Sequence, residues 1–252
     1  MQSYGNLSTR FYNADKPDAP PKPLAFIKAI ATELNGPIWE PMCGSGRFLI
    51  PLRKDGFDID GSDASPEMLQ SCRSRLGHLG IRSEVLEQKL HESAMPRKYN
   101  LAFILSGSFG LINDQNDAQE SLRRIYDHLT PGGKFVVEVS RVSLHESNSW
   151  PWGGRWVDID ANRRILCSWL GSYDAETRIS KSVLKYELFV NGVLNSTELD
   201  DFNLKYYEDE EFVAMLNEAG FQVEQTLNDE CDGESEEDDC DVVFVCNKAT
   251  TK

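Results

Sequence analysis

The chain has 252 residues and a formal net charge of −15 at pH 7. Such a charge argues against a partner bound mainly through phosphates, because that binding depends on Lys and Arg. Residues 229–241 carry nine acids and no base, so the net charge of the remaining residues is about −6, a common value for a soluble domain. The charge therefore disfavours a nucleic-acid partner but does not exclude one. No apolar run approaches the roughly 18 residues of a membrane span, so we expect no membrane partner.

The N-terminal stretch, MQSYGNLSTRFYN, lacks the basic and then apolar pattern of a secretory signal, which favours a cytoplasmic location. The six cysteines are scattered without a CxxC pair, and we expect reduced thiols and no metal site. Asn228, Glu230, Asp232 and Gly233 imitate the start of an EF-hand loop. Because the flanking patterns are strands, a solvated loop is the better interpretation.

Residues 1–23 are polar and then proline-rich, and we interpret them as an N-terminal cap segment with a short helix near Leu7–Tyr12. The aromatic side chains of Tyr4, Phe11 and Tyr12 need a surface to cover. They either pack on the main domain or form a flap over a ligand.

The first part of the main domain alternates helical and extended patterns. Apolar spacing predicts a helix over Leu24–Leu34, ended by Asn35-Gly36-Pro37. A strand, Ile38–Glu40, then leads into the glycine turn Cys43–Gly46 and a helix of about Gly46–Lys54. The turn glycines permit positive φ and let a ligand approach the backbone closely. This strand–turn–helix unit predicts a small-molecule site.

The same alternation continues to Val139. Ser65 is a predicted N-cap and Pro66 the first residue of a helix that ends near Leu79. The other predicted elements are a strand at Phe57–Asp63, a short strand at Ser83–Gln88, a strand buried on both faces at Tyr99–Ser106, a helix at Ala118–Leu129, a turn at Pro131–Gly133 and a strand at Lys134–Val139. The order predicts an α/β fold with a Rossmann-like, doubly wound parallel sheet.

After Ser140 the pattern changes to antiparallel strands. Residues 155–206 contain long extended runs separated by turn residues, with Asn191-Gly192 as a strong hairpin signal. A helix at Asp209–Ala219 and two strands, FQVEQTL and DVVFVCN, return to the core and complete a mostly parallel sheet of seven strands. We expect a core of residues 24–140 and 207–252, with residues 141–206 as an antiparallel insert that caps the substrate.

Phosphate-binding functions of the glycine turn are disfavoured. A dinucleotide fingerprint requires a third glycine, but Leu49 stands at that place. A P-loop requires Gly-Lys-Ser/Thr, and the chain has Gly46-Arg47-Phe48.

From Pro37 onward the chain resembles the class I S-adenosylmethionine-dependent methyltransferases, of the small-molecule type. The resemblance rests on EPMCGSGR, GSDASPEML, SGSFGLI, HLTPGGKFVVEV and LKYYEDEEFVAMLNEAGF, in the order of the family. It implies S-adenosyl-L-methionine as the cofactor. By this resemblance Gly44 and Gly46 make backbone contacts and Arg47 is a candidate for the methionine carboxylate.

The acids fit a cationic cofactor with free ribose hydroxyls. Asp63 ends the second strand, where a carboxylate can accept both hydroxyls, and Glu40 ends the first, facing the amino-methionine end. Further expected cofactor contacts are Ala64, Met68, Gln88 and Ser106. Relatives often carry an acid for the adenine amino group where this chain has Lys89; Gln88 either replaces it through its amide or is an ordinary loop residue.

We expect the acceptor at the carboxyl ends of the fourth and fifth strands. The candidate pocket residues are Tyr4, Tyr12, Ser108, Phe109, Arg141 and Trp152. Trp150, Trp152 and Trp156 form either an aromatic box or ordinary packing. His145 is a weak candidate for a general base, with a structural role as the alternative.

The leading hypothesis is a methyltransferase that moves a methyl group to a small-molecule acceptor by in-line displacement, a reaction that depends mostly on proximity and orientation. The chain lacks the Asn/Asp-Pro-Pro-Tyr/Phe pattern of many nucleobase and glutamine methyltransferases. An RNA or protein methyltransferase, or a non-catalytic S-adenosylmethionine-binding regulatory module, remain the alternatives. The sequence does not determine the oligomeric state.

Overall fold

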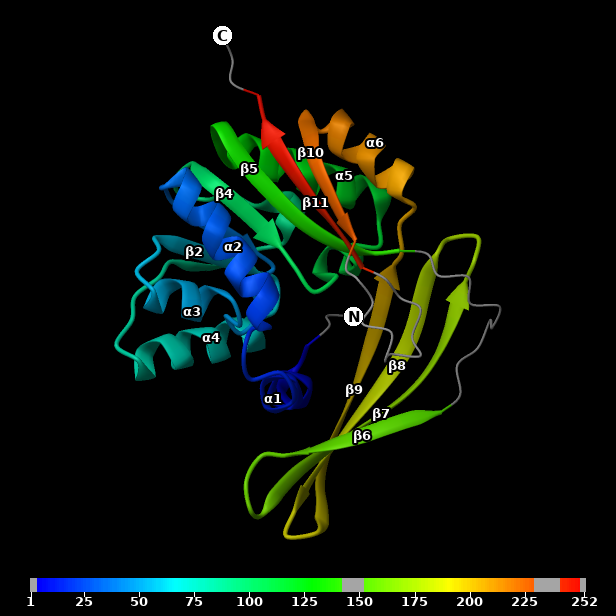
Figure 1. Ribbon diagram of the computed structural model, residues 1–252. Coiled ribbons are helices and arrows are strands. Elements are labelled where there is room, and N and C mark those ends of the chain that lie inside the picture. Colours follow the sequence, from blue (N-terminus) through cyan, green and yellow to red (C-terminus); the bar gives the residue numbers. More distant parts are fainter. Residues whose placement is uncertain (1–3, 142–151, 229–240, 250–252) are drawn as a thin grey trace.

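The computed structural model describes residues 4–141, 152–228 and 241–249 (Figure 1). The helices are α1 (Asn6–Asp15), α2 (Pro21–Leu34), α3 (Leu49–Lys54), α4 (Pro66–His78), α5 (Gln115–His128) and α6 (Asp209–Glu218), with short 3₁₀ helices η1 (Leu90–Glu92) and η2 (Ser108–Leu111). The strands are β1 (Ile38–Pro41), β2 (Ile59–Asp63), β3 (Val85–Glu87), β4 (Tyr99–Ile104), β5 (Leu129–Ser140), β6 (Gly153–Asp158), β7 (Arg163–Asp174), β8 (Ile179–Val190), β9 (Val193–Lys205), β10 (Phe221–Asn228) and β11 (Asp241–Lys248).

The core is a seven-stranded sheet in the order β10-β11-β5-β4-β1-β2-β3. Strands β1 to β5 are parallel, and β11 pairs antiparallel with both β5 and β10. The chain leaves β1 in one direction, through β2 and β3, and then returns to the other side through β4. The boundary between β1 and β4 is therefore the topological switch point, where open α/β sheets bind ligands.

Both faces of this sheet are covered, as the continuous apolar strands predict. Helices α2, α3 and α4 pack on one face with Leu101, Phe103 and Val136. Helices α5 and α6 pack on the other face with Ala102 and Ile104. Alternate residues of β4 thus point to opposite layers, and the expected doubly wound, mostly parallel fold is confirmed.

Two local predictions need correction. The helix after the glycine turn begins at Leu49, not Gly46, because Gly46 has a φ of +79° that no α-helix contains. The segment Pro131–Gly133 lies inside β5, not in a separate turn. Its register with β4 shifts between Tyr99 and Leu101, and Gly132 has a φ of +78°, so the expected turn is an irregularity within the strand.

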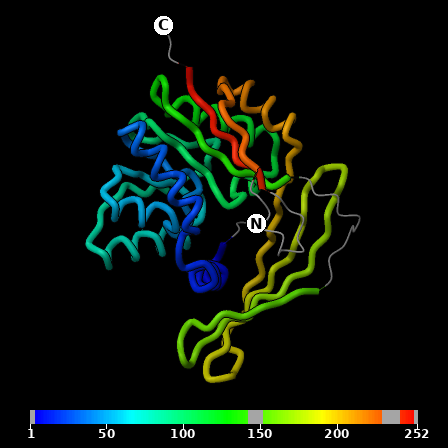
Figure 2. Tube along the Cα trace, viewed as in Figure 1, coloured from blue at the N-terminus to red at the C-terminus, as the bar shows by residue number. Residues whose placement is uncertain are grey.

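The second sheet is antiparallel, in the order β6-β7-β8-β9, as predicted for the insert. Asn191 and Gly192 connect β8 to β9 with φ angles of +51° and +78°, the conformation expected of an Asn-Gly hairpin. Helix α1 packs on one face of this sheet through Leu7 and Phe11. Figure 2 shows the resulting path: α1 lies between the core and the antiparallel sheet.

Polar contacts fix α1 to both partners. The carboxylate of Glu198 on β9 accepts hydrogen bonds from the backbone N–H groups of Leu7 (3.0 Å) and Ser8 (3.1 Å), at the start of the helix. On the other side, Asn13 Nδ2 donates to Ser71 Oγ of α4 at 2.8 Å. The first turn of α1 is thus held by an acid from the insert, and its last turn by the core.

Among the described residues, no helix combines the length and apolar character that crossing a membrane would require. Residues 229–240, which hold most of the predicted acidic loop, lie outside the described part of the chain.

The docking of α1 predicts the effect of removing its capping acid. Glu198→Ala should leave two N–H groups at the helix start without their acceptor, which lowers the free energy of unfolding by about 1 kcal/mol. Chemical denaturation of the purified variant measures this loss. Glu176→Ala, in the exposed turn between β7 and β8, is the matched control and should unfold like the wild type. Equal stability of both variants would contradict the capping role.

Candidate functional site

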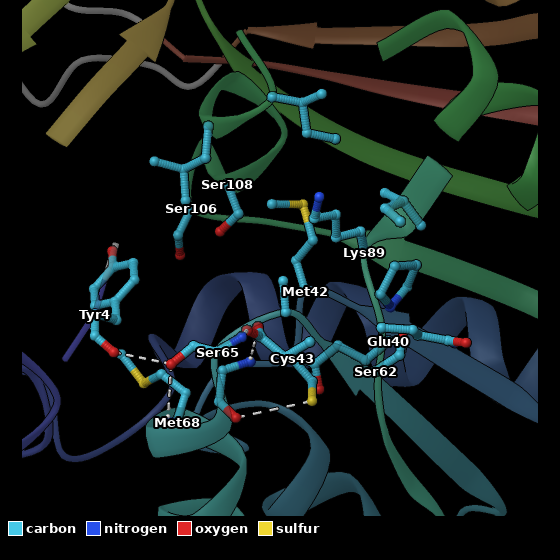
Figure 3. Close-up of a pocket in the computed structure, with 18 of the residues that line it drawn as sticks. Tyr4, Glu40, Met42, Cys43, Ser62, Ser65, Met68, Lys89, Ser106 and Ser108 are labelled. Atoms are coloured by element: carbon cyan, nitrogen blue, oxygen red, sulfur yellow. Dashed lines mark hydrogen bonds between the residues drawn. The ribbon is translucent and has the colours of Figure 1, made fainter. Parts of the chain in front are cut away.

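A cavity of about 710 Å³ lies at the carboxyl ends of the central strands (Figure 3). Its walls come from the turn after β1, the ends of β2 and β4, the loop after β3 and the N-terminal segment. Both sides of the β1/β4 switch point contribute. The following predicted site residues line it: Tyr4, Tyr12, Glu40, Gly44, Arg47, Asp63, Ala64, Met68, Gln88, Ser106 and Ser108.

Asp63 connects three segments of the wall. Its Oδ2 accepts a hydrogen bond from the Gly44 N–H and its Oδ1 accepts one from the Ser65 N–H, both at 2.8 Å. Ser65 caps α4 by accepting from the Met68 N–H at 3.2 Å, and its hydroxyl donates to the Tyr4 carbonyl at 2.9 Å. Burial raises the pKa of Asp63 above its ordinary value, although these backbone donors oppose the rise.

Glu40 is a buried acid with unused bonding capacity. Its side chain is 6% exposed, and its Oε2 has no hydrogen-bond partner among the described residues. Burial raises the pKa of Glu40 well above its ordinary value, and the N–H of Leu49, which donates to the carboxylate, opposes this only in part. A buried carboxylate oxygen without a donor is costly, so the site favours a ligand that brings a donor or a positive charge.

The two turn glycines have different tasks. Gly44 has a φ of +53° and lies on the cavity, with Met68 Sδ at 3.8 Å from where a Cβ would stand. Gly46 does not line the cavity. A Cβ there would lie 2.7 Å from Cys72 Sγ, so Gly46 permits close packing of α4 against the turn. Of the two glycines expected to contact the ligand, Gly44 lines the cavity and Gly46 lies behind it.

Gln88 lines the cavity with its amide already engaged. Its Oε1 accepts from the Ala94 N–H at 3.0 Å, and its Nε2 lies 3.0 Å from Met95 Sδ. The amide therefore holds the loop after β3, and one lone pair of its oxygen is left for a donor from the cavity. The neighbouring Lys89 is exposed and lines the same cavity. Arg47 also lines it, and its Nε donates to the Asp18 carbonyl at 2.8 Å.

Three predicted pocket residues lie elsewhere. Phe109 is fully buried against Phe212, with ring centroids 5.3 Å apart, because its ring points into the layer between the sheet and α6. Arg141 forms a bidentate pair with Asp209 at 2.8 and 2.6 Å, which joins the end of β5 to α6. Trp152 is 64% exposed and stands just before β6, away from the cavity.

His145 and Trp150 lie outside the described residues. Trp156 is 60% exposed on β6 and does not contact the cavity. Among the described residues, β6 to β9 contribute no lining side chain. The antiparallel sheet instead acts through the N-terminal segment, since Asp200 Oδ2 accepts from the Tyr4 N–H at 3.2 Å.

Sequence reasoning missed several lining residues. Met42 stands inside the recognised turn, with a φ of +56°, and the pattern EPMCGSG could have drawn attention to it. His91 and Asp117 also line the cavity, with Nδ1 and Oδ2 3.6 Å apart. Their pairing depends on the packing of η1 against α5, which a local sequence pattern does not predict.

The comparisons with known proteins agree with this geometry. Residues 38–133 match a family model described as a methyltransferase domain. The chain is 24% identical over 228 residues to the putative methyltransferase YqeM of Bacillus subtilis (strain 168), covering 90% of this chain and 89% of that protein.

Two solved structures have the same fold over nearly their whole length. An S-adenosylmethionine-dependent methyltransferase from Clostridium acetobutylicum ATCC 824 has a TM-score of 0.76 at 16% identity, covering 95% of this chain and 96% of that one. The S-adenosylmethionine-bound CalS10 of Micromonospora echinaspora, an amino pentose methyltransferase involved in calicheamicin biosynthesis, has a TM-score of 0.70 at 15% identity, covering 99% of each chain.

The matched domain spans the glycine turn, the acid-ended second strand and β4, and the shared fold extends through the antiparallel insert. Residues 38–133 of this chain are therefore a methyltransferase domain, and the chain has the fold of S-adenosylmethionine-dependent methyltransferases.

Proposed function

We propose that this enzyme transfers the methyl group to a small-molecule acceptor by in-line displacement. The observation that carries the proposal is the cavity at the β1/β4 switch point, whose volume of about 710 Å³ is in the range of small-molecule sites. Tyr4 is tied to Ser65 of the core and to Asp200 of the insert, so the N-terminal segment forms one wall of this cavity. A small ligand can enter such a site more readily than a folded macromolecule.

Glu40 and Asp63 suit the two polar ends of the cofactor, which supplies an electrophilic methyl group when bound. The unpartnered Oε2 of Glu40 would accept from the methionine ammonium, directly or through water. Asp63 would accept the ribose hydroxyls with the lone pairs that Gly44 and Ser65 leave free. Gly44 would let the backbone approach, and Ala64 and Met68 would pack beside the nucleoside.

The chain's own contribution to rate would be orientation and the exclusion of water. Tyr4 and Tyr12 stand edge to face, with centroids 5.9 Å apart, and both line the cavity. With Ser106 and Ser108 from the loop after β4, they would hold the acceptor in line with the transferred methyl. No general base is needed when the acceptor arrives unprotonated.

The acceptor class that we propose is a small polar molecule with an amino group. CalS10, whose fold this chain shares, acts on an amino pentose by its name. The cavity offers several acids, among them Asp114 and Asp117, that would receive the hydroxyl and amino groups of such a molecule. The net charge of −15 argues against RNA as the acceptor.

A transfer assay tests this proposal directly. The purified enzyme is incubated with S-adenosylmethionine labelled in the methyl group and with three panels: amino-sugar nucleotides and other small amines, bulk tRNA, and a protein extract. We expect label in a small-molecule amine and none in the macromolecules. Label in tRNA or protein alone, or cofactor binding without any transfer, would contradict the proposal.

The role assigned to Asp63 predicts a loss of cofactor affinity. Asp63→Ala removes a charged acceptor, worth about 1.5–3 kcal/mol per hydrogen bond, so the Kd for S-adenosylhomocysteine should rise roughly 10- to 100-fold. Titration calorimetry measures it. Asp58→Ala is the matched control, because Asp58 pairs with Arg97 at 2.9 Å and does not line the cavity. A Kd for Asp63→Ala equal to that of the control would exclude the contact.

The raised pKa of Glu40 predicts a pH-dependent difference between the wild type and Glu40→Gln. Folding binds protons when a folded pKa is raised, so stability falls as pH rises from the ordinary value of 4.5 through the folded value. Without cofactor, the variant should match the wild type below about pH 4.5 and become increasingly more stable above it. Urea denaturation across pH measures this difference.

With saturating S-adenosylhomocysteine, the same difference should shrink, because the ligand's ammonium would compensate the buried charge. A difference that is independent of pH and of ligand would contradict the assignment of Glu40.

A further inference from the structure

Three of the residues that line the cavity have a backbone conformation that their side chains disfavour. The described chain has six non-glycine residues with positive φ. Asn35 ends α2, Arg178 lies between β7 and β8, and Asn191 is in the β8–β9 hairpin, so turn geometry accounts for these. The others, Tyr4, Met42 and Ser106, all line the cavity. Such outliers cluster at functional sites in proteins.

Met42 is the outlier that turn chemistry explains least. Its φ is +56°, in the left-handed region, where an L-residue other than Asn or Asp costs about 1–2 kcal/mol relative to glycine. Unlike Asn, methionine has no short polar side chain to bond the local backbone. Glycine at this position would remove the cost, as it does at Gly44 and Gly46 in the same turn.

The position of Met42 relates it to the ligand site. Met42 directly follows β1 and Ser106 follows β4, and these two strands are neighbours on either side of the switch point. In Figure 3 the Met42 side chain rises from the turn into the cavity, in the direction of Lys89 and Ser108. It is half-buried and packs only in part against the core layer of α5 and α6. The part of its surface that the core does not cover faces the cavity.

We propose that Met42 is a binding residue of the cofactor site, whose thioether side chain packs against bound S-adenosylmethionine. The strained backbone is the consequence of placing an apolar, polarisable side chain where glycine would fit without strain. The inference rests on the cofactor site proposed above and extends it to a group that the resemblance to the family did not indicate.

The test compares three variants by titration with S-adenosylhomocysteine and by thermal unfolding without ligand. Met42→Gly removes both the side chain and the strain, and we expect about tenfold weaker binding, the equivalent of one lost apolar contact of about 1.4 kcal/mol. Its unliganded melting temperature should be no lower than that of the wild type, because release of strain offsets the lost packing. Met42→Leu, which keeps apolar bulk, should bind within about threefold of the wild type.

Asn35→Gly is the matched control, since it relieves a left-handed residue outside the cavity, and its affinity should be unchanged. Equal affinity of Met42→Gly and wild type would overturn the inference while leaving the cofactor site intact. A clear drop in the unliganded melting temperature of Met42→Gly would also overturn it, because Met42 would then be a core residue. Absence of binding by the wild type would instead refute the cofactor site itself.

Discussion

The carboxylate of Asp63 is the contact on which the rest of the site depends. It receives the N–H of Gly44 and the N–H of Ser65, each at 2.8 Å, and so joins the end of β2 to the glycine turn and to the start of α4. The Ser65 hydroxyl donates a hydrogen bond to the Tyr4 carbonyl, and the Tyr4 N–H donates one to Asp200 of the insert. One half-buried acid thus organises a chain of hydrogen bonds from the glycine turn to the antiparallel sheet. The same residue is the one proposed to accept the ribose hydroxyls.

Much of the fold could be predicted because local patterns determine it. The apolar run of β4, the N-cap at Ser65 and the Asn191-Gly192 hairpin each specify their own conformation, and the structure has all three. The errors came where tertiary geometry overrides a local pattern. The sequence pattern predicts a helix that begins at Gly46. Because Gly46 has a positive φ and packs against Cys72, α3 begins only at Leu49.

Only some of the residues that line the cavity could be predicted from the sequence. Residues next to a strand end, such as Glu40 and Asp63, could be assigned to the cavity because parallel strands present their carboxyl ends together. The orientation of Phe109, which points into the core, depends on packing against α6. The pairing of Arg141 with Asp209 and of His91 with Asp117 joins segments far apart in sequence, which no spacing reveals. Met42 cannot be found from spacing either, because what distinguishes it is its φ angle of +56°.

We propose that Glu40 and Asp63 receive the two polar ends of one cofactor across the β1/β4 switch point. A crystal structure of the protein with S-adenosylhomocysteine would show both contacts. We expect the ribose hydroxyls within hydrogen-bond distance of the Asp63 carboxylate, and the amino group beside Glu40, directly or through one water. A cofactor bound with its ribose away from Asp63, or outside this cavity, would contradict it.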